Sequence, residues 1–268
     1  MLKLSNILLN PKKARRHPFE IILSGFFYAS ISLIISVWIF PEYASLLMVF
    51  LTVISSLYLV QEILIIEEEK EKNINSESFV LKSHLKTLWF FMLLFFGFLL
   101  AFVFWTIVLP ENMVSTAFNI QQLTFQNISS VTGRVVFSGT FSTIFFNNLR
   151  VLFLSLLLAL FYGAGAVFIL VWNASMMGFV IGDLTRNTLG LASLPQVFMK
   201  YLLHGIPEIL AYFAIALAGG ILFISIIKGD IKKRNIKRTL IDITILILIS
   251  IFLLFIAALI ETYISPFI

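Results

Sequence analysis

The stretch that decides the fold spans residues 141–184, and it reads FSTIFFNNLRVLFLSLLLALFYGAGAVFILVWNASMMGFVIGDL. As a single helix it would be about 66 Å long, roughly twice the hydrocarbon thickness of a bilayer, which is about 30 Å. The stretch therefore predicts two membrane-spanning helices joined near Gly163 and Gly165. One alternative keeps the same topology: a helix as far as Trp172 followed by a partial return.

The composition of the whole chain agrees with a membrane protein. The chain has 268 residues, of which 60% are hydrophobic and 12% are charged, and its mean hydropathy is +1.01. An ordinary soluble domain is about 45–50% apolar and about 25% charged. These figures exclude a soluble enzyme, a nucleic-acid-binding domain and a disordered protein. Because the chain has no cysteine, disulfides, thiolate metal sites and cysteine nucleophiles are excluded as well.

Further apolar runs lie on both sides of residues 141–184. Each is about as long as a bilayer is thick, and Trp89 and Trp105 flank the third run as interfacial anchors. The sequence therefore predicts an all-α, polytopic membrane helix bundle with about seven crossings and with short or broken helices around 141–184 and at Pro207. The expected spans are about 19–40, 43–66, 88–109, 141–162, 166–184, one ending at 227, and 240–260.

The distribution of basic residues predicts the orientation in the cell membrane. Cytoplasmic segments of membrane proteins carry an excess of Lys and Arg. If residues 1–18, 67–88 and 228–238 are cytoplasmic, all but four of the 19 basic residues lie inside. The N-terminus is then cytoplasmic, and 141–184 must cross twice to bring residue 228 back inside. The segments expected outside are 110–140 and 185–196.

Several polar residues fall within or beside the predicted spans. Such side chains are costly against lipid, so they are expected to face the interior of the bundle. One interpretation is a polar cavity open to the outside, and the other is hydrogen bonding from helix to helix. The residues of this predicted intramembrane cluster are Asn147, Asn148, Asn173, Asp183, His204 and Glu208.

His204 and Glu208 are spaced i and i+4, so they share one helical face. Pro207 lacks an N–H and suits the first position of a helix, which predicts a helix of residues 207–227. We expect His204 to be the nearest partner of Glu208, completed by Asn147, Asn148 or Asn173. The pair is either a clamp that docks this helix or a cation or proton site reached from outside.

No motif of a known enzyme is present. The chain has no His-Glu-x-x-His, no Gly-x-Ser-x-Gly and no phosphate-binding glycine loop. A metal-dependent hydrolase using Asp183, His204 and Glu208 is the weakest hypothesis, because catalytic zinc usually takes three protein ligands and a water. We therefore predict a protein that is not an enzyme, with no catalytic residues, no metal and no cofactor. The pattern Gly178-x-x-x-Gly182 predicts close helix packing.

Five groups of residues from about residue 85 onward carry a family resemblance: Phe145-Phe146-Asn147-Asn148, Gly163-Ala164-Gly165, Asn173 with Gly178, His204-Gly205-Ile206-Pro207-Glu208, and Ala216 to Gly220. In these residues the chain resembles the stage II sporulation protein M family of bacterial and archaeal membrane proteins. The resemblance would divide the chain into a basic segment with a first helical pair (1–66), a charged cytoplasmic loop (67–88), and the family's membrane domain (85–268) with its outer segment 110–140. One departure is Ala174 after Asn173, where the family often has glycine.

The resemblance implies a membrane scaffold. In spore-forming bacteria the family member is similar to a scaffold that works with peptidoglycan-cutting partners, and that sporulation role is not carried over to this chain. The leading hypothesis is a non-enzymatic membrane protein that organises protein partners, or copies of itself, within the lipid bilayer and binds no nucleic acid. The alternative is a transporter or channel with a polar solute or ion site in the outer half of the membrane.

Overall fold

The computed structural model describes residues 18–72, 77–133, 141–159, 164–227 and 236–265, and within these residues the chain is helical with no strand. Seven helices are long and apolar enough to cross a membrane, which confirms the predicted all-α, polytopic architecture. The helices are α2 (Pro18–Ile39), α3 (Ala44–Lys72), α4 (Glu77–Val108), α5 (Glu111–Ala117), α6 (Asn119–Gly133), α7 (Phe141–Ala159), α8 (Ala164–Asp183), α9 (Leu194–Ile227) and α10 (Ile236–Tyr263).

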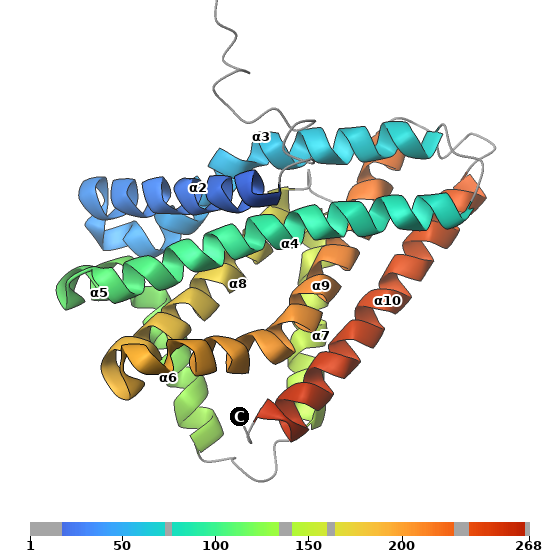
Figure 1. Ribbon diagram of the computed structural model, residues 1–268. Helices are drawn as coiled ribbons and strands as arrows, with labels where there is room; N and C mark the ends of the chain where they lie inside the picture. Colours follow the sequence, from blue (N-terminus) through green and yellow to red (C-terminus); the bar gives the residue numbers. More distant parts are fainter. Residues whose placement is uncertain (1–17, 73–76, 134–140, 160–163, 228–235, 266–268) are drawn as a thin grey trace, which may run out of the picture.

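The spanning helices form two packed groups. Helices α2 and α3 pack together, α2 lies along α4, and α4 lies along α8. Helices α7, α9 and α10 form the second group, and α8 contacts both groups. In Figure 1 the end of α3, the start of α4, the end of α9 and the start of α10 lie toward the upper right, and the two groups diverge from there.

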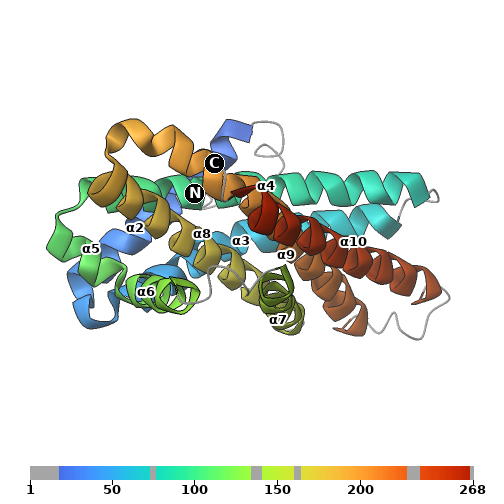
Figure 2. The ribbon, with the colours of Figure 1, turned by 90° about the horizontal axis from the view of Figure 1, so that it is seen from below.

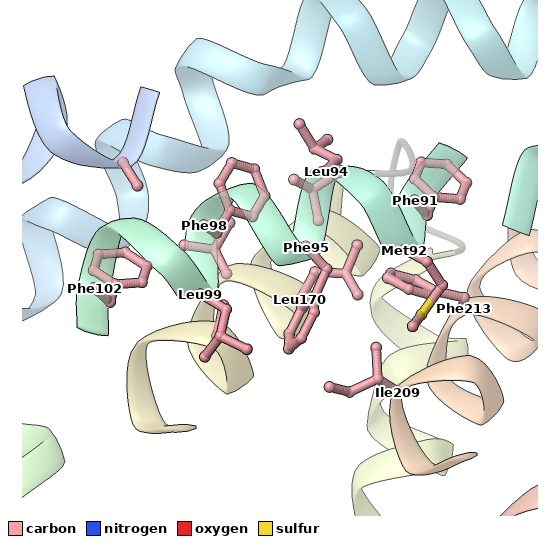
Figure 3. Packing of buried hydrophobic residues seen from close by; sticks show 14 of the residues in the cluster. Phe91, Met92, Leu94, Phe95, Phe98, Leu99, Phe102, Leu170, Ile209 and Phe213 are labelled. Atoms are coloured by element: carbon pink, nitrogen blue, oxygen red, sulfur yellow. The ribbon is translucent and has the colours of Figure 1, made fainter. Parts of the chain in front are cut away.

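Helix α4 is the most buried of the seven spans. Its buried phenylalanine and leucine side chains belong to one cluster with residues such as Leu170 of α8 and Ile209 and Phe213 of α9 (Figure 3). The ring of Phe213 on α9 stacks on Phe91 with their centroids 5.6 Å apart, and it meets Phe95 edge-on at 6.4 Å. Because lipid is as apolar as these side chains, close packing rather than exclusion of water holds such helices together.

Glycines set the closest helix contacts. A Cβ on Gly25 of α2 would lie 2.6 Å from the carbonyl oxygen of Leu94, so α2 and α4 touch backbone to backbone. A Cβ on Gly182 of α8 would lie 2.6 Å from Cβ of Thr106, and one on Gly178 would overlap Phe102. The close packing predicted from the Gly178–Gly182 pattern is therefore confirmed, and its partner is α4.

The stretch 141–184 forms two helices, as predicted. Helix α7 ends at Ala159 and α8 begins at Ala164, so α8 already includes Gly165, while residues 160–163 lie outside the described residues. The alternative with a return after Trp172 is wrong, because α8 is continuous through that residue. A π-helical turn, Leu184–Leu189, and a short 3-10 turn, Leu191–Ser193, then lead from α8 to α9.

Pro207 does not begin a helix, so that expectation is wrong. It lies inside α9, which is 34 residues long and therefore about 51 Å in length, too long for one straight crossing. Proline removes one backbone hydrogen bond and crowds the carbonyl four residues earlier, and both effects bend a helix without necessarily ending it. Figure 1 shows α9 crossing the lower part of the view and then turning upward.

The polar segments between spans are also largely helical. Helix α3 continues past its apolar span and α4 begins before its own, so residues 67–72 and 77–88 of the charged segment, which was expected as a loop, are helical. Residues 73–76 lie outside the described residues. In the segment 110–140, expected to lie outside, the described residues form α5 and α6, and residues 134–140 lie outside the described residues. Gln121 anchors α6, since its amide donates to Ser175 Oγ at 3.0 Å and its carbonyl accepts from Ser45 Oγ.

Candidate functional site

The hydrogen bonds described for the six polar residues predicted to form one intramembrane cluster run to residues outside that set. The carboxylate of Asp183, at the end of α8, accepts a hydrogen bond from Asn187 Nδ2 at 2.7 Å. Asn173 donates to the carbonyl oxygen of Ile169 at 2.7 Å, within its own helix. On α7, Asn148 is 7% exposed, whereas Asn147 is on the exposed side. The hydrogen bonds of Asn173 and Asp183 therefore join residues that are four apart in the sequence and do not connect different spanning helices.

His204 and Glu208 lie on one face of α9, but each has a partner other than the one predicted. Glu208 Oε1 accepts a hydrogen bond from the hydroxyl of Tyr212 at 2.7 Å. His204 Nδ1 lies 3.1 Å from Ser265 Oγ, just after α10. Helical side chains lean toward the N-terminus, so Tyr212, one turn further on, reaches back to Glu208. The polar stripe of α9 is therefore longer than the sequence indicated.

A second carboxylate, on α10, lies near this stripe. Glu261 is partly buried and lies close enough to Glu208 and Tyr212 to interact with both electrostatically. Sequence reasoning missed this residue, because it was placed just beyond the last span, whereas α10 continues to Tyr263. The available signal was its position: it is the only acid in the chain after Asp242.

We define the α9–α10 polar site as His204, Glu208, Tyr212, Glu261 and Ser265. Two ionised carboxylates repel each other at low dielectric, so the site is less stable when both carboxyl groups are charged and neither is paired. Asn148 of α7 lies one turn before Leu152, which packs in the same buried cluster as Tyr212. Within the described residues, no three His, Asp or Glu side chains are close enough to hold a metal ion, so the arrangement proposed for a hydrolase is not formed there.

Comparison with known proteins gives the family. Residues 92–266 match the family described as stage II sporulation protein M. The chain belongs to this family. An uncharacterised protein of Methanocaldococcus jannaschii is 30% identical to it over 151 residues, which are 55% of this chain and 82% of that relative. No solved structure matches the chain.

The match to the stage II sporulation protein M family begins within α4 and ends just after α10. It therefore contains every residue of the α9–α10 polar site and all six residues of the predicted cluster. Helices α2 and α3 lie outside the match, although they pack closely on α4 and α8. This family protein is a multi-pass membrane protein.

Proposed function

We propose that this family member is a non-enzymatic membrane scaffold of the cell membrane that binds partner proteins through one side of α7. Of the seven spanning helices, α7 is the least buried within the chain. Its buried side, formed by Asn148, Leu152, Ser155 and Ala159, packs toward α9 and α10. The single observation that carries the proposal is the mixture of large apolar and polar residues on the opposite side.

That opposite side, which we term the α7 outer face, combines large apolar residues with polar ones. Its exposed residues are Thr143, Phe146, Asn147, Arg150, Phe153, Leu154 and Leu157. A lipid-facing helix is normally apolar throughout, and a charged residue near the middle of a span costs about 2.5–3.5 kcal/mol on insertion scales. A surface that mixes phenylalanine with asparagine and arginine at membrane depth is typical of a helix covered by another protein.

Site-specific photo-crosslinking in living cells tests the proposal. A photoreactive phenylalanine analogue introduced at Phe146, Phe153 or Leu157 is expected to crosslink to a discrete second polypeptide. The matched control is Leu248 on α10, which is apolar and 62% exposed but has no polar neighbours of this kind, and it should crosslink mainly to lipid. Equal crosslinking from α7 and from Leu248 would contradict the proposal.

One observation favours transport as a second candidate function. Glu208 on α9 and Glu261 on α10 are both partly buried within two packed spanning helices, and intramembrane carboxylates often mark ion or proton pathways. Purified protein in liposomes should then carry protons or a monovalent cation, and Glu208→Gln should abolish that flux while the protein stays folded. Flux with this dependence would replace the pure scaffold proposal.

A further inference from the structure

We propose that the α7 outer face binds a transmembrane helix of a different membrane protein, one that carries a carboxylate near its middle. The inference rests on the proposed scaffold function and deepens it by giving the chemistry of the partner. Arg150 carries the inference, supported by Asn147 and by the apolar residues on the same face.

Arg150 lies at the middle of α7, and the middle of a spanning helix is where a charge is hardest to solvate. It is the tenth of the nineteen residues of α7, so it lies about 14 Å along the helix from Phe141. It is two residues from both Asn148 and Leu152, which places it about 200° around the helix from the buried side. Figure 2 shows α7 at the edge of the molecule, with no other labelled helix beyond it.

The contrast with Arg186 shows what such a guanidinium requires. Arg186, beyond the end of α8, donates to the backbone carbonyl oxygens of Thr106 and Leu109 and so caps the end of α4. Arg150 is exposed, and among the described residues no acceptor or carboxylate is paired with it. A guanidinium has five N–H donors in a fixed fork that matches a carboxylate. A carboxylate supplied from outside this chain satisfies both the charge and the donors.

The rest of the face fits a helix as the occupant. Asn147 lies one turn from Arg150, at a spacing that lets both side chains reach the same carboxylate. Phe146, Phe153 and Leu154 flank this polar pair and give a partner helix apolar surface to pack against. The face therefore has a polar centre with an apolar surround. This is the reverse of most interfaces between soluble proteins, which have an apolar core and a polar rim.

A second copy of this chain fits less well. Paired copies in closed dimers usually meet through the same surface. Helix α7 has no acidic residue, so such a pairing would place one Arg150 near the other with no counter-ion on that helix. The carboxylates of the α9–α10 polar site are partly buried between their own helices. The partner is therefore a different protein.

Synthetic transmembrane helices test the chemistry directly. The probes are fluorescent polyleucine peptides with Glu, Gln or Leu at the central position, reconstituted at low density with labelled protein in phosphatidylcholine vesicles. Energy transfer should report binding of the Glu peptide at least tenfold tighter than binding of the Leu peptide, with the Gln peptide between them. In Arg150→Leu this preference should vanish, and in Arg150→Lys it should be reduced. Leu248→Ala on α10 is the matched control and should keep the full preference.

Three results would overturn the inference. The first is equal binding of the three peptides to the wild-type protein. This result is decisive by itself, because it does not depend on whether any variant folds. Self-association that is lost in Arg150→Leu would assign the face to a second copy. An effect of Arg150→Leu that appears only in vesicles containing anionic lipid would assign Arg150 to a lipid phosphate. If crosslinking from α7 finds a partner but the peptides bind equally, the acidic partner is wrong and the scaffold function survives.

Discussion

Gly25 and Gly97 illustrate how a single missing side chain positions two helices. Ala is favoured over Gly in a helix by about 1 kcal/mol, so a Gly→Ala change is ordinarily stabilising. At Gly97, however, a Cβ would overlap the carbonyl oxygen of Ile22 and the backbone of Gly25. Backbone atoms cannot rotate away, so α2 would have to move off α4.

Gly97→Ala should therefore destabilise the purified protein by about 1–3 kcal/mol, the usual cost of overpacking. The measurement is thermal unfolding in detergent, followed by loss of the monodisperse peak in size-exclusion chromatography. Gly220→Ala is the matched control, because Gly220 is also helical but has nothing within 4 Å of its Cβ position. It should leave the melting temperature unchanged or raise it. Equal effects of the two changes would show that the contact at Gly97 is not limiting.

At the residue scale, two variants of Glu208 distinguish a structural clamp from a charge-dependent site. Glu208→Gln keeps an acceptor oxygen for the Tyr212 hydroxyl, so a clamp should retain its stability. Glu208→Ala leaves that buried hydroxyl without its partner, which costs about 1–3 kcal/mol. Thermal unfolding of both variants is the measurement. A loss of stability in Gln as large as in Ala would mean that the charge itself is required, and equal stability of Ala and wild type would exclude a clamp.

At the scale of helices, the sequence was sufficient to predict features that depend on a single segment of the chain. Length and hydropathy fix the number of spans, and the length of residues 141–184 alone required two helices. The contacts between helices were not predictable in the same way. The partner of Glu208, the nearby Glu261 and the contact of Gly25 with Gly97 each depend on which helices become neighbours. Pro207 is a similar case, since packing on both sides of a bend decides whether a proline ends a helix or only bends it.

Helix α6 gives a prediction at this scale, because one buried side chain connects it to two spanning helices. Gln121→Leu keeps the volume of the side chain but removes its hydrogen bonds with Ser45 and Ser175. Losing about 1.4 kcal/mol of local stability should speed amide hydrogen exchange in residues 119–126 about tenfold. Gln126→Leu is the control, since Gln126 is exposed. Unchanged exchange in both variants would mean that α6 is held by other contacts.

For the whole molecule, the arrangement of helix ends supports the orientation predicted from charge. The end of α3, the start of α4, the end of α9 and the start of α10 lie on one side of the molecule (Figure 1). The charged segment 67–88 and the basic segment 228–238 connect these ends, which agrees with the predicted topology, where both segments lie on one side of the membrane. Their excess of Lys and Arg indicates the cytoplasm.

The absence of cysteine from the sequence allows this orientation to be tested without background labelling. Lys233→Cys lies in the basic segment, and Asn112→Cys lies on α5, where the native side chain is exposed. In intact cells a membrane-impermeant maleimide should label position 112 and should reach position 233 only after lysis. Because the two positions are separated by an odd number of crossings, they must respond oppositely in either orientation, so labelling of both or neither before lysis would contradict the seven-span topology. Labelling of position 233 alone would keep the seven spans but invert them, and the α9–α10 polar site, together with the outer helices α5 and α6, would then face the cytoplasm.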